Sequence, residues 1–398
     1  MEMGKLILVA NPGSSSRKYG LFRNEEPLAT LHFETENSKV VCTYKSADGT
    51  KRELPCDFSN IAESVSHIAA ILESEGQVTT ERPLDAIAVR IVAPMDSFTR
   101  DRIVDDSFMD EFNAARSKAP LHIPVIASEI EHLRESFKDL PIIAVSDSAF
   151  HASKPELMKY YPFDTKLADK YDIKRYGYHG LSVGSIVHQL KQAGRLPEKL
   201  IVAHVGSGSS VTAVRDGISL DTSMGYTPLE GVMMATRSGS IDVGAAIAIK
   251  KALELDDDGL EKYLNKEAGM LGVSGSTNDM RDLIALADKG DTRAAFAYAL
   301  YIYRVQSLIG QMAASLDGAD AIVLTATILE RNDQVRGDII KKLSYLGFEI
   351  DSEINKSFPD EALVNIATED SKPIYVIRTD ETGEMLRRAI IVLESPND

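Results

Sequence analysis

A repeated Gly/Ser hairpin constrains the fold of this chain more than any other feature. The stretch "NPGSSSRKYG" (residues 11–20) follows the apolar run "KLILVA", and "KLIVAHVGSGSSVTAV" from Lys199 repeats the arrangement about half a chain length later. Each copy has the pattern of an apolar strand, a Gly/Ser turn and a second strand. A single copy would be typical of an ordinary hairpin. Two matched copies predict an internally duplicated core, and the 398-residue length agrees with two domains.

The segments around the hairpins have the alternating pattern of an α/β chain. Strands are expected at residues 85–92, 141–150, 319–327 and 373–381, helices at 107–119, from about 182, at 292–316 and at 383–395, and loops at 76–83 and 154–164. We expect an N-terminal α/β domain of residues 1–149, on which the C-terminal helix (382–398) packs back. A C-terminal domain of residues 150–381 would complete two related domains around a cleft.

Composition limits the classes of function. Hydrophobic residues make up 44% and charged residues 26% of the chain, as in ordinary globular proteins. No apolar run approaches the roughly 20 residues that span a bilayer, and "LILVA" is too short for a signal-peptide core. The two cysteines, Cys42 and Cys56, are expected to be free thiols in a reducing compartment, so we place the protein in the cytoplasm. A net charge of −16 argues against a nucleic-acid surface.

The hairpin turns have the chemistry of phosphate binding. Successive backbone N–H groups in a Gly/Ser turn form a concavity that binds phosphate oxygens without net protein charge. In the first turn the serine hydroxyls and Lys18 add donors, and Asn11 lies at a strand end, where cleft residues of α/β proteins project. Two such turns facing one cleft would hold two parts of a polyphosphate, as in nucleotide-using enzymes of the actin-like class.

Longer motifs resemble one family. The segments "NPGSSSRK", "KAPLHIPV", "AVSDSAFH", "RYGYHGLS", "AHVGSGSS", "DTSMGYTPLEGVMMATRSGSIDVG" and "SGSTNDMRDL" are similar to those of acetate kinases, in the same order across almost the whole chain. The resemblance implies the two-domain actin-like (ribonuclease H-like) fold of the acetate and sugar kinases. It further implies ATP or ADP as co-substrate, Mg²⁺ with Mn²⁺ as the alternative ion, and a homodimer joined through the C-terminal domain.

The resemblance assigns roles to residues at matching positions. A carboxylate substrate is ionised at neutral pH and needs no general base, so catalysis rests on positioning and charge neutralisation of the phosphoryl group. Arg90, Arg237 and His179 match the groups around the acyl phosphate. Asn11, Asp147 and Glu381 match residues that orient the phosphates and hold Mg²⁺, with the two carboxylates expected from opposite domains. The remaining assigned positions are the phosphate and nucleotide residues Ser14, Ser16, Lys18, His204, Gly206, Ser207, Gly208, Thr327 and Glu330, and the acyl-methyl pocket Val92, Leu121, Tyr178 and Pro228.

Three departures from the family pattern concern both substrates. His-Arg-Val-Val-His-Gly-Gly is here "VRIVAPM", which keeps Arg90, and the second turn, Gly-Asn-Gly in the family, has Ser207 in place of asparagine. The adenosine loop Thr-Gly-Gly-Ile-Gly-Glu-Asn is "TATILER", with Ala326, Thr327 and Leu329 at glycine positions and Arg331 in place of asparagine. We expect Cβ groups at Thr327 and Leu329 to narrow the purine slot.

Alternatives remain at each level. Taken alone, Arg90 could be an ion-paired arginine, His179 a capping or core histidine and Asp147 a turn residue; His122 and His151 are interpreted as structural. The sequence predicts Mg-dependent phosphoryl transfer from ATP to acetate or another short carboxylate. The alternatives are a pyrophosphate- or phosphate-dependent enzyme, a propionate or butyrate kinase, a weakened metabolite-binding relative, and an actin-like filament or chaperone ATPase.

Overall fold

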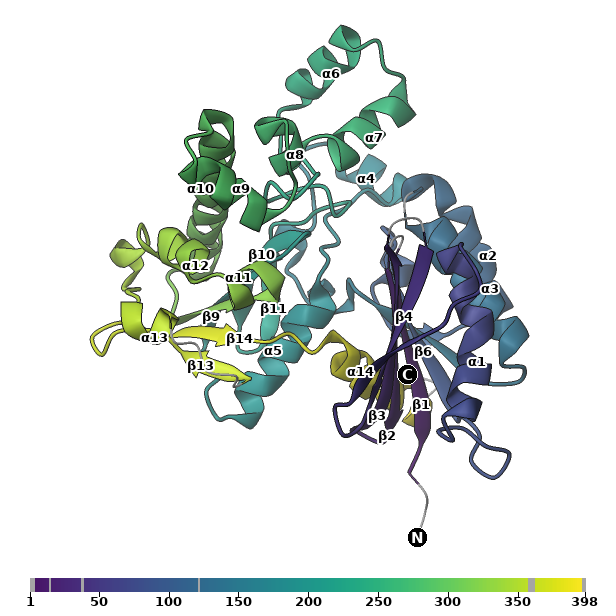
Figure 1. Ribbon diagram of the computed structural model, residues 1–398. Helices are drawn as coiled ribbons and strands as arrows, with labels where there is room; N and C mark the ends of the chain where they lie inside the picture. Colours follow the sequence, from purple (N-terminus) through teal and green to yellow (C-terminus); the bar gives the residue numbers. More distant parts are fainter. Residues whose placement is uncertain (1–3, 14–15, 37–38, 121, 357–361, 396–398) are drawn as a thin grey trace. The chain divides into compact units, whose positions relative to one another are not determined.

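The chain divides into two compact units. A computed structural model describes residues 4–13, 16–36, 39–120, 122–356 and 362–395. Close Cα packing groups Met1–Ala149 with Asp380–Asp398 as the first unit, and Phe150–Thr379 as the second (Figure 1). The expected second domain of residues 150–381 is therefore two residues too long, because Asp380 and Glu381 belong with the first unit.

The described part of the first unit contains a mixed eight-stranded sheet. Its strands lie in the spatial order β5–β4–β3–β2–β1–β6–β8–β7. β1 is antiparallel to β2 and parallel to β6, which is parallel to β8. The predicted first hairpin is thus confirmed, and three strands that the sequence analysis did not identify, β3, β4 and β5, extend the sheet. The strands are β1 (Leu6–Pro12), β2 (Ser16–Arg23), β3 (Glu26–Glu36), β4 (Lys39–Ser46), β5 (Lys51–Leu54), β6 (Ala86–Ile91), β7 (Arg102–Ile103) and β8 (Ile142–Ser146).

Helices cover both faces of this sheet. Leu6, Leu8 and Ala10 of β1 lie in one apolar core with residues of α1 (Ser64–Ser74), α2 (Asp106–Ala114) and α3 (Ile123–Ser136). Because successive side chains of a strand alternate between faces, Ile7 and Val9 point to the opposite face. There α14 (Glu381–Glu394) packs along β1, β6 and β8 (Figure 1). The helix expected at 107–119 ends at Ala114, and a separate short 3-10 turn follows it.

The second unit repeats the arrangement. Its described sheet has the order β11–β10–β9–β12–β14–β13, with β9 antiparallel to β10 and parallel to β12. In both units a hairpin strand is thus paired on one side with an antiparallel partner and on the other with parallel strands, which confirms the duplicated core. The strands are β9 (Lys199–Val205), β10 (Ser209–Arg215), β11 (Ile218–Thr222), β12 (Ala321–Thr325), β13 (Leu363–Asn365) and β14 (Ile374–Ile377).

The helices of the second unit include the long buried helix that the sequence predicts. α10 (Thr292–Leu316) begins and ends at the predicted residues and packs on β9, β10 and β11. The strand expected to reach residue 327 ends at Thr325, where the chain turns into α11. Among the described residues no helix is long and apolar enough to cross a membrane. The other helices are α4 (Thr165–Tyr171), α5 (Gly180–Gln192), α6 (Val243–Ala252), α7 (Asp257–Lys266), α8 (Gly269–Ser274), α9 (Met280–Asp288), α11 (Ala326–Arg331), α12 (Asp333–Ile340) and α13 (Ser352–Lys356).

Candidate active site

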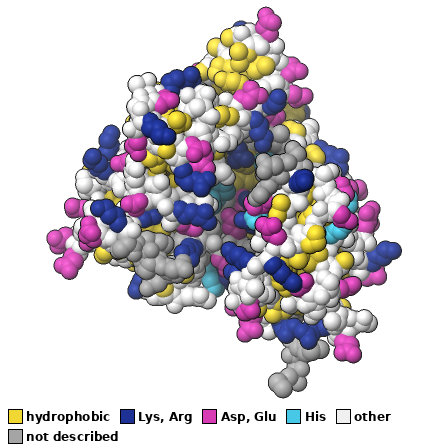
Figure 2. Space-filling model, in the orientation of Figure 1, with side chains coloured by type: hydrophobic (Ala, Val, Ile, Leu, Met, Phe, Trp, Pro, Cys, Tyr) yellow, Lys and Arg dark blue, Asp and Glu magenta, His cyan; other side chains and the backbone are white. Residues whose placement is uncertain are grey.

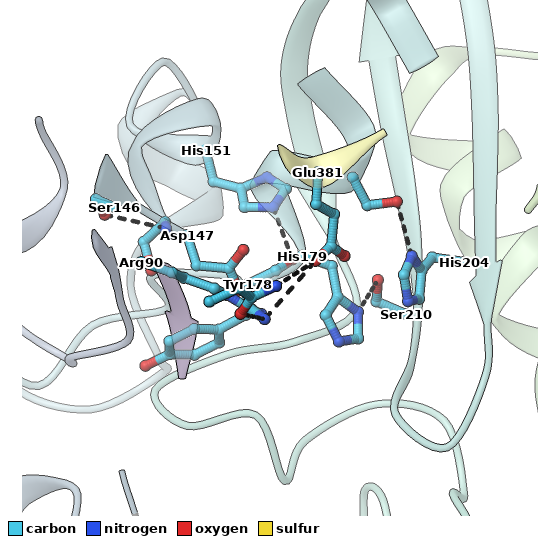
Figure 3. A network of polar contacts seen from close by, with 12 residues as sticks. Arg90, Ser146, Asp147, His151, Tyr178, His179, His204, Ser210 and Glu381 are labelled. Carbon is cyan, nitrogen blue, oxygen red and sulfur yellow. Dashed lines mark hydrogen bonds and ion pairs between the residues drawn. The ribbon is translucent and has the colours of Figure 1, made fainter. Parts of the chain in front are cut away.

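In the first unit three predicted residues, Asn11, Asp147 and Glu381, surround the guanidinium of a fourth, Arg90. Arg90 Nη2 donates to Asp147 Oδ2 at 3.0 Å, and Arg90 Nη1 donates to Asn11 Oδ1 at 3.3 Å. Glu381 Oε2 lies 3.8 Å from Arg90 Nη1 and accepts from Asn11 Nδ2 at 3.4 Å (Figure 3). Residues 370 positions apart in the sequence are thus neighbours. The two carboxylates come from the same unit, so the expectation that they come from opposite domains is wrong.

Strand alternation and one helix end produce this cluster. Arg90 is on β6 between Val89 and Ile91, which both face the core of α1–α3, so its side chain points to the α14 face. Asp147 follows β8 directly, at the carboxyl end where polar residues of parallel strands gather. Glu381 is the first residue of α14.

A second ion pair anchors α14 on the sheet. Arg388 donates through Nε to Asp101 Oδ2 at 2.7 Å and through Nη2 to the Ser146 carbonyl at 2.8 Å. Ser146 is the last residue of β8 and precedes Asp147. These hydrogen bonds connect the helix that carries Glu381 to the strand end that precedes Asp147. The sequence analysis did not identify Arg388 or Asp101.

Two carboxylates favour the charged form of the partly buried Arg90 side chain. Burial alone would lower the pKa of the Arg90 guanidinium, but Asp147 and Glu381 raise the pKa above its ordinary value. Asp147 is only 1% exposed, so its charge is also shielded from water. The cluster is therefore a fixed cation bordered by oxygen ligands.

In the second unit, two histidines lie beside the second Gly/Ser turn. The rings of His179 and His204 stack with their centroids 4.2 Å apart. His179 Nδ1 is 3.0 Å from Ser210 Oγ, and His204 Nδ1 is 2.8 Å from Ser182 Oγ (Figure 3). Each ring thus uses one nitrogen on a serine hydroxyl, which fixes the ring orientation. His179 has a φ of 59°, a left-handed conformation that is uncommon for a residue with a side chain.

Arg237 extends over the same turn. Its loop is joined to the turn by a hydrogen bond from Ala235 N to the Ser207 carbonyl at 3.4 Å. A Cβ placed on Gly208 would be 3.2 Å from His179 Nε2 and 3.7 Å from Arg237 Nη1. Glycine at this position therefore allows both donors to approach the backbone closely. The turn, the imidazole and the guanidinium form a compact set of donors for a phosphate or phosphoryl group.

A pocket of about 320 Å³ lies next to this turn, within the second unit. Methionine and isoleucine side chains form its apolar walls, whereas amide and charged groups form the rest. This mixture suits a flat heteroaromatic ring with polar edges. The lining residues are Ser207, Ala235, Met270, Asn278, Asp279, Met280, Arg281, Thr327, Ile328, Arg331 and Asn332.

Comparison with known proteins identifies the family. The model of the acetokinase family matches residues 6–387. The chain belongs to the acetokinase family. It is 38% identical over 386 residues to the acetate kinase of Methanosarcina acetivorans, with 94% of each chain covered. Among solved structures, a propionate kinase from Francisella tularensis is 32% identical, with a TM-score of 0.88 and 96% and 98% of the two chains covered. The Porphyromonas gingivalis acetate kinase is 28% identical, with a TM-score of 0.86 and coverage of 98% and 100%.

The adenosine loop of the acetokinase family has two unexpected features in this chain. Ala326, at the first family glycine, has a φ of 69°, so the backbone keeps the conformation that glycine favours. Leu329, at the third, is fully buried in the core of the second unit and is not among the pocket-lining residues. The expectation that Leu329 narrows the purine slot is therefore wrong, because its position in α11 directs it inward. Thr327 and Arg331 do line the pocket.

The other predicted residues lie as follows. Glu330 Oε1 accepts from Ala326 N at 2.9 Å and Thr379 N at 3.2 Å, which holds the loop, and Glu330 is not a pocket-lining residue. His151, interpreted as structural, is fully buried with both ring nitrogens in hydrogen bonds. Ser16 begins β2 and Lys18 is exposed on it, whereas Ser14 and Leu121 lie outside the described residues. In the acyl-pocket set, Val92 belongs to the first unit and Tyr178 and Pro228 to the second.

Sequence analysis missed several pocket residues that were within its reach. Asn278, Asp279 and Arg281 belong to "SGSTNDMRDL", which carried the resemblance but received no role. Arg281 forms a forked ion pair with Asp279, with Nε–Oδ1 at 3.0 Å and Nη2–Oδ2 at 2.6 Å. The available signal was the polar pair Asn278 and Asp279 directly before an amphipathic helix, a pattern typical of a helix N-terminus.

Replacing Ala326 with glycine is expected to stabilise the protein by about 1 kcal/mol, because the left-handed conformation no longer costs a Cβ clash. Denaturant unfolding measures the difference. Ala70→Gly, at an exposed position of the right-handed helix α1, is the matched control and should destabilise by a similar amount. A destabilised Ala326→Gly protein would show that position 326 is not strained.

Proposed function

We propose that this chain catalyses reversible phosphoryl transfer between a nucleoside triphosphate and acetate, giving acetyl phosphate. The observation that carries the proposal is the Arg90 cation, held between Asp147 and Glu381 beside Asn11. Membership of the acetokinase family supports the reaction class. The alternatives of a weakened binding relative and of a filament-forming ATPase find less support, because neither needs this set of residues.

The chain's own residues do positioning and charge work. An acetate ion is already a nucleophile at neutral pH, so no group has to remove a proton. Guanidinium forks match the geometry of carboxylate and phosphoryl oxygens, so Arg90 and Arg237 are the groups we assign to neutralise charge as the phosphoryl group moves. His179 donates a hydrogen bond to the same group.

Mg²⁺ fits the oxygen donors of the first-unit cluster. The ion usually takes one or two carboxylates, waters and substrate phosphate oxygens, rather than a closed protein cage. In the described part of the chain, no group of three or more His, Cys, Asp or Glu is close enough to hold a metal by itself. Asn11 and Glu381, together with Asp147, would hold Mg²⁺ directly or through water, and the ion when bound would neutralise phosphate charge.

Acyl phosphate formation tests the proposal directly. The purified chain is incubated with acetate and Mg²⁺, and the product is trapped with hydroxylamine as the hydroxamate. ATP, GTP and pyrophosphate are compared as donors in parallel. Product from none of the three would contradict the proposed function, whereas product from pyrophosphate alone would support the pyrophosphate-dependent alternative.

We expect adenosine to contribute little to donor binding. Thr327 and Arg331 project into a pocket that the family lines with glycine and asparagine at these positions, so less room and different hydrogen bonds remain for adenine. Calorimetry should find ADP at most about tenfold tighter than pyrophosphate in the presence of Mg²⁺. The variant Thr327→Gly, Arg331→Asn should bind ADP about tenfold more tightly and leave pyrophosphate binding unchanged. Tight adenine-specific binding by the original chain, with no gain in the variant, would contradict the narrowed slot.

We expect kcat/KM to fall from acetate to propionate to butyrate. Val92, Leu121, Tyr178 and Pro228 are the proposed walls around the acyl methyl group, and one extra methylene changes such binding by about 1–3 kcal/mol. Tyr178 is held in place, because its hydroxyl donates to the Tyr226 carbonyl at 2.7 Å. Val92→Ala should improve propionate relative to acetate. A higher kcat/KM for butyrate than for acetate in the original chain would remove these residues from the acyl pocket.

We further propose that the protein is a cytoplasmic homodimer joined through its second unit. Figure 2 shows hydrophobic side chains gathered where Figure 1 draws α6. Ile241, Val243 and Ile247 are exposed there, and α6 contains no buried residue. An apolar helix surface of this kind is typical of a protein contact.

A further inference from the structure

One charged pair lies inside the core of the first unit. Arg17 of β2 is 3% exposed and Glu129 of α3 is 0% exposed, and Arg17 Nη1 donates directly to Glu129 Oε2. Tyr19 completes the contact, since its hydroxyl donates to Glu129 Oε1 at 2.6 Å. Burial raises the pKa of the Glu129 carboxyl, while the Arg17 charge lowers it.

This pair has no place in the proposed chemistry. Both groups lie on the face that contacts α1 and α3, because Tyr19 packs in that core with Leu8 and Ala10. A buried ion pair often gives less stability than an apolar pair of similar size, because both ions lose their hydration. Its best-attested use is to fix the register of one element against another. The Arg17–Glu129 pair is therefore better explained by a role in positioning β2 than by a contribution to stability.

The Arg17–Glu129 pair lies on the β1–β2 hairpin, whose turn the sequence predicts to bind phosphate. In the β1–β2 ladder Arg17 is paired with Pro12, and Lys18 with Asn11. Directly paired residues of an antiparallel ladder share a face, so Asn11 and Lys18 lie together on the α14 side. Arg17 and Lys18 consequently point to opposite faces of the sheet. Arg17 is buried against α3, and Lys18 is exposed.

A slip of β2 by one residue would exchange these two faces. Lys18 would then enter the core opposite Glu129 without the forked geometry of arginine, and Arg17 would replace Lys18 beside Asn11. Glu129 also accepts from Tyr19, two residues along the same face, so a slipped strand would lose both contacts. The pair thus selects the register in which Lys18, and not Arg17, lies beside Asn11.

We propose that the buried Arg17–Glu129 pair is a positioning element for the phosphoryl donor, which fixes β2 of the β1–β2 hairpin so that Lys18 lies beside Asn11 and faces the donor. The inference rests on the proposed phosphoryl transfer. Arg17 and Glu129 touch no substrate and act through Lys18. The bound group is the polyphosphate of the donor, and the acetate subsite is not involved.

The kinetic test removes both charges and follows the two substrates separately. The Arg17→Met, Glu129→Leu variant keeps side-chain volume and leaves no unpaired buried charge. We expect kcat/KM for the donor to fall about 10–100-fold, with KM for acetate within about twofold of the original. The control Arg52→Gln, Glu75→Gln removes an ion pair between β5 and the residue that follows α1, in the same unit, and should change neither value. Equal effects on donor and acetate would overturn the proposal.

A double-mutant cycle with Lys18→Ala asks whether the pair acts through Lys18. We expect loss of the pair to cost less than about threefold in the Lys18→Ala background, because the residue that it positions is already absent. A full 10–100-fold loss in that background would be additive and would overturn the positioning role.

Hydrogen exchange gives a readout that does not depend on turnover. Without the pair, backbone amides of residues 9–11 and 16–20 should exchange at least about tenfold faster, while those of α10 stay unchanged. Unchanged exchange in the hairpin would overturn the inference even if the enzyme is active. Absence of acyl phosphate formation by the original chain would instead contradict the proposed function, and exchange would still decide the role of the pair.

Discussion

Replacing Arg90 with alanine is expected to lower kcat by about 10²–10³-fold, which corresponds to about 3–4 kcal/mol of transition-state stabilisation. Arg90 is the one cation of the described first-unit cluster, and it contacts Asn11, Asp147 and Glu381 together. Alanine removes the charge and also leaves the surrounding carboxylates to repel the donor phosphates. Steady-state kinetics with saturating acetate and donor measures the change.

Stability has to be followed in the same variant. Asp147 is buried beside Arg90, so removal of the cation destabilises the first unit as well as the transition state. Arg90→Lys retains the positive charge but loses the paired N–H donors of the guanidinium. Its kcat should therefore lie between that of the original chain and that of the alanine variant. The matched control is Arg102→Ala, since both arginine side chains are 21% exposed and ion-paired, but Arg102 is bound to Glu111 away from the cluster. Normal turnover of Arg90→Ala would exclude Arg90 from the mechanism.

The Arg237→Ala substitution is expected to lower kcat by a similar amount, about 10²–10³-fold. The Arg237 guanidinium lies over Gly208 together with His179, so it is placed to donate to a phosphoryl group bound at the second turn. Because the stabilised charge develops mainly in the transition state, KM for either substrate should change much less than kcat. Initial rates over a matrix of acetate and donor concentrations separate these quantities.

The Arg237 experiment has its own controls. Arg293→Ala removes an arginine of the same unit that donates to the Val273 carbonyl at 3.4 Å and should retain normal kcat. Arg237→Lys should recover only part of the rate, because one ammonium cannot donate two parallel hydrogen bonds. A rise in KM with unchanged kcat would reassign Arg237 from the transition state to ground-state binding.

Much of the fold could be predicted from local pattern. The two hairpins, the long helix α10 and the polar strand end before Asp147 all follow from apolar periodicity and turn residues, which act over a few positions. The same locality explains the small errors at the ends of elements. At Thr325 an apolar strand runs into α11 because Ala326 takes a left-handed conformation, and alanine gives no sign of this in the sequence.

The sequence by itself determined the chemical character of the site: Asn11, Arg90, Asp147, His179 and Arg237 in motifs whose donors suit a phosphoryl group. Only the tertiary structure decided which of these groups meet. It brought Glu381 into the first unit beside Arg90, directed Leu329 into the core and buried Arg17 against Glu129. The physical reason is that periodicity tells which side chains share a face of a strand or helix. Which partner covers that face depends on packing between residues tens to hundreds of positions apart.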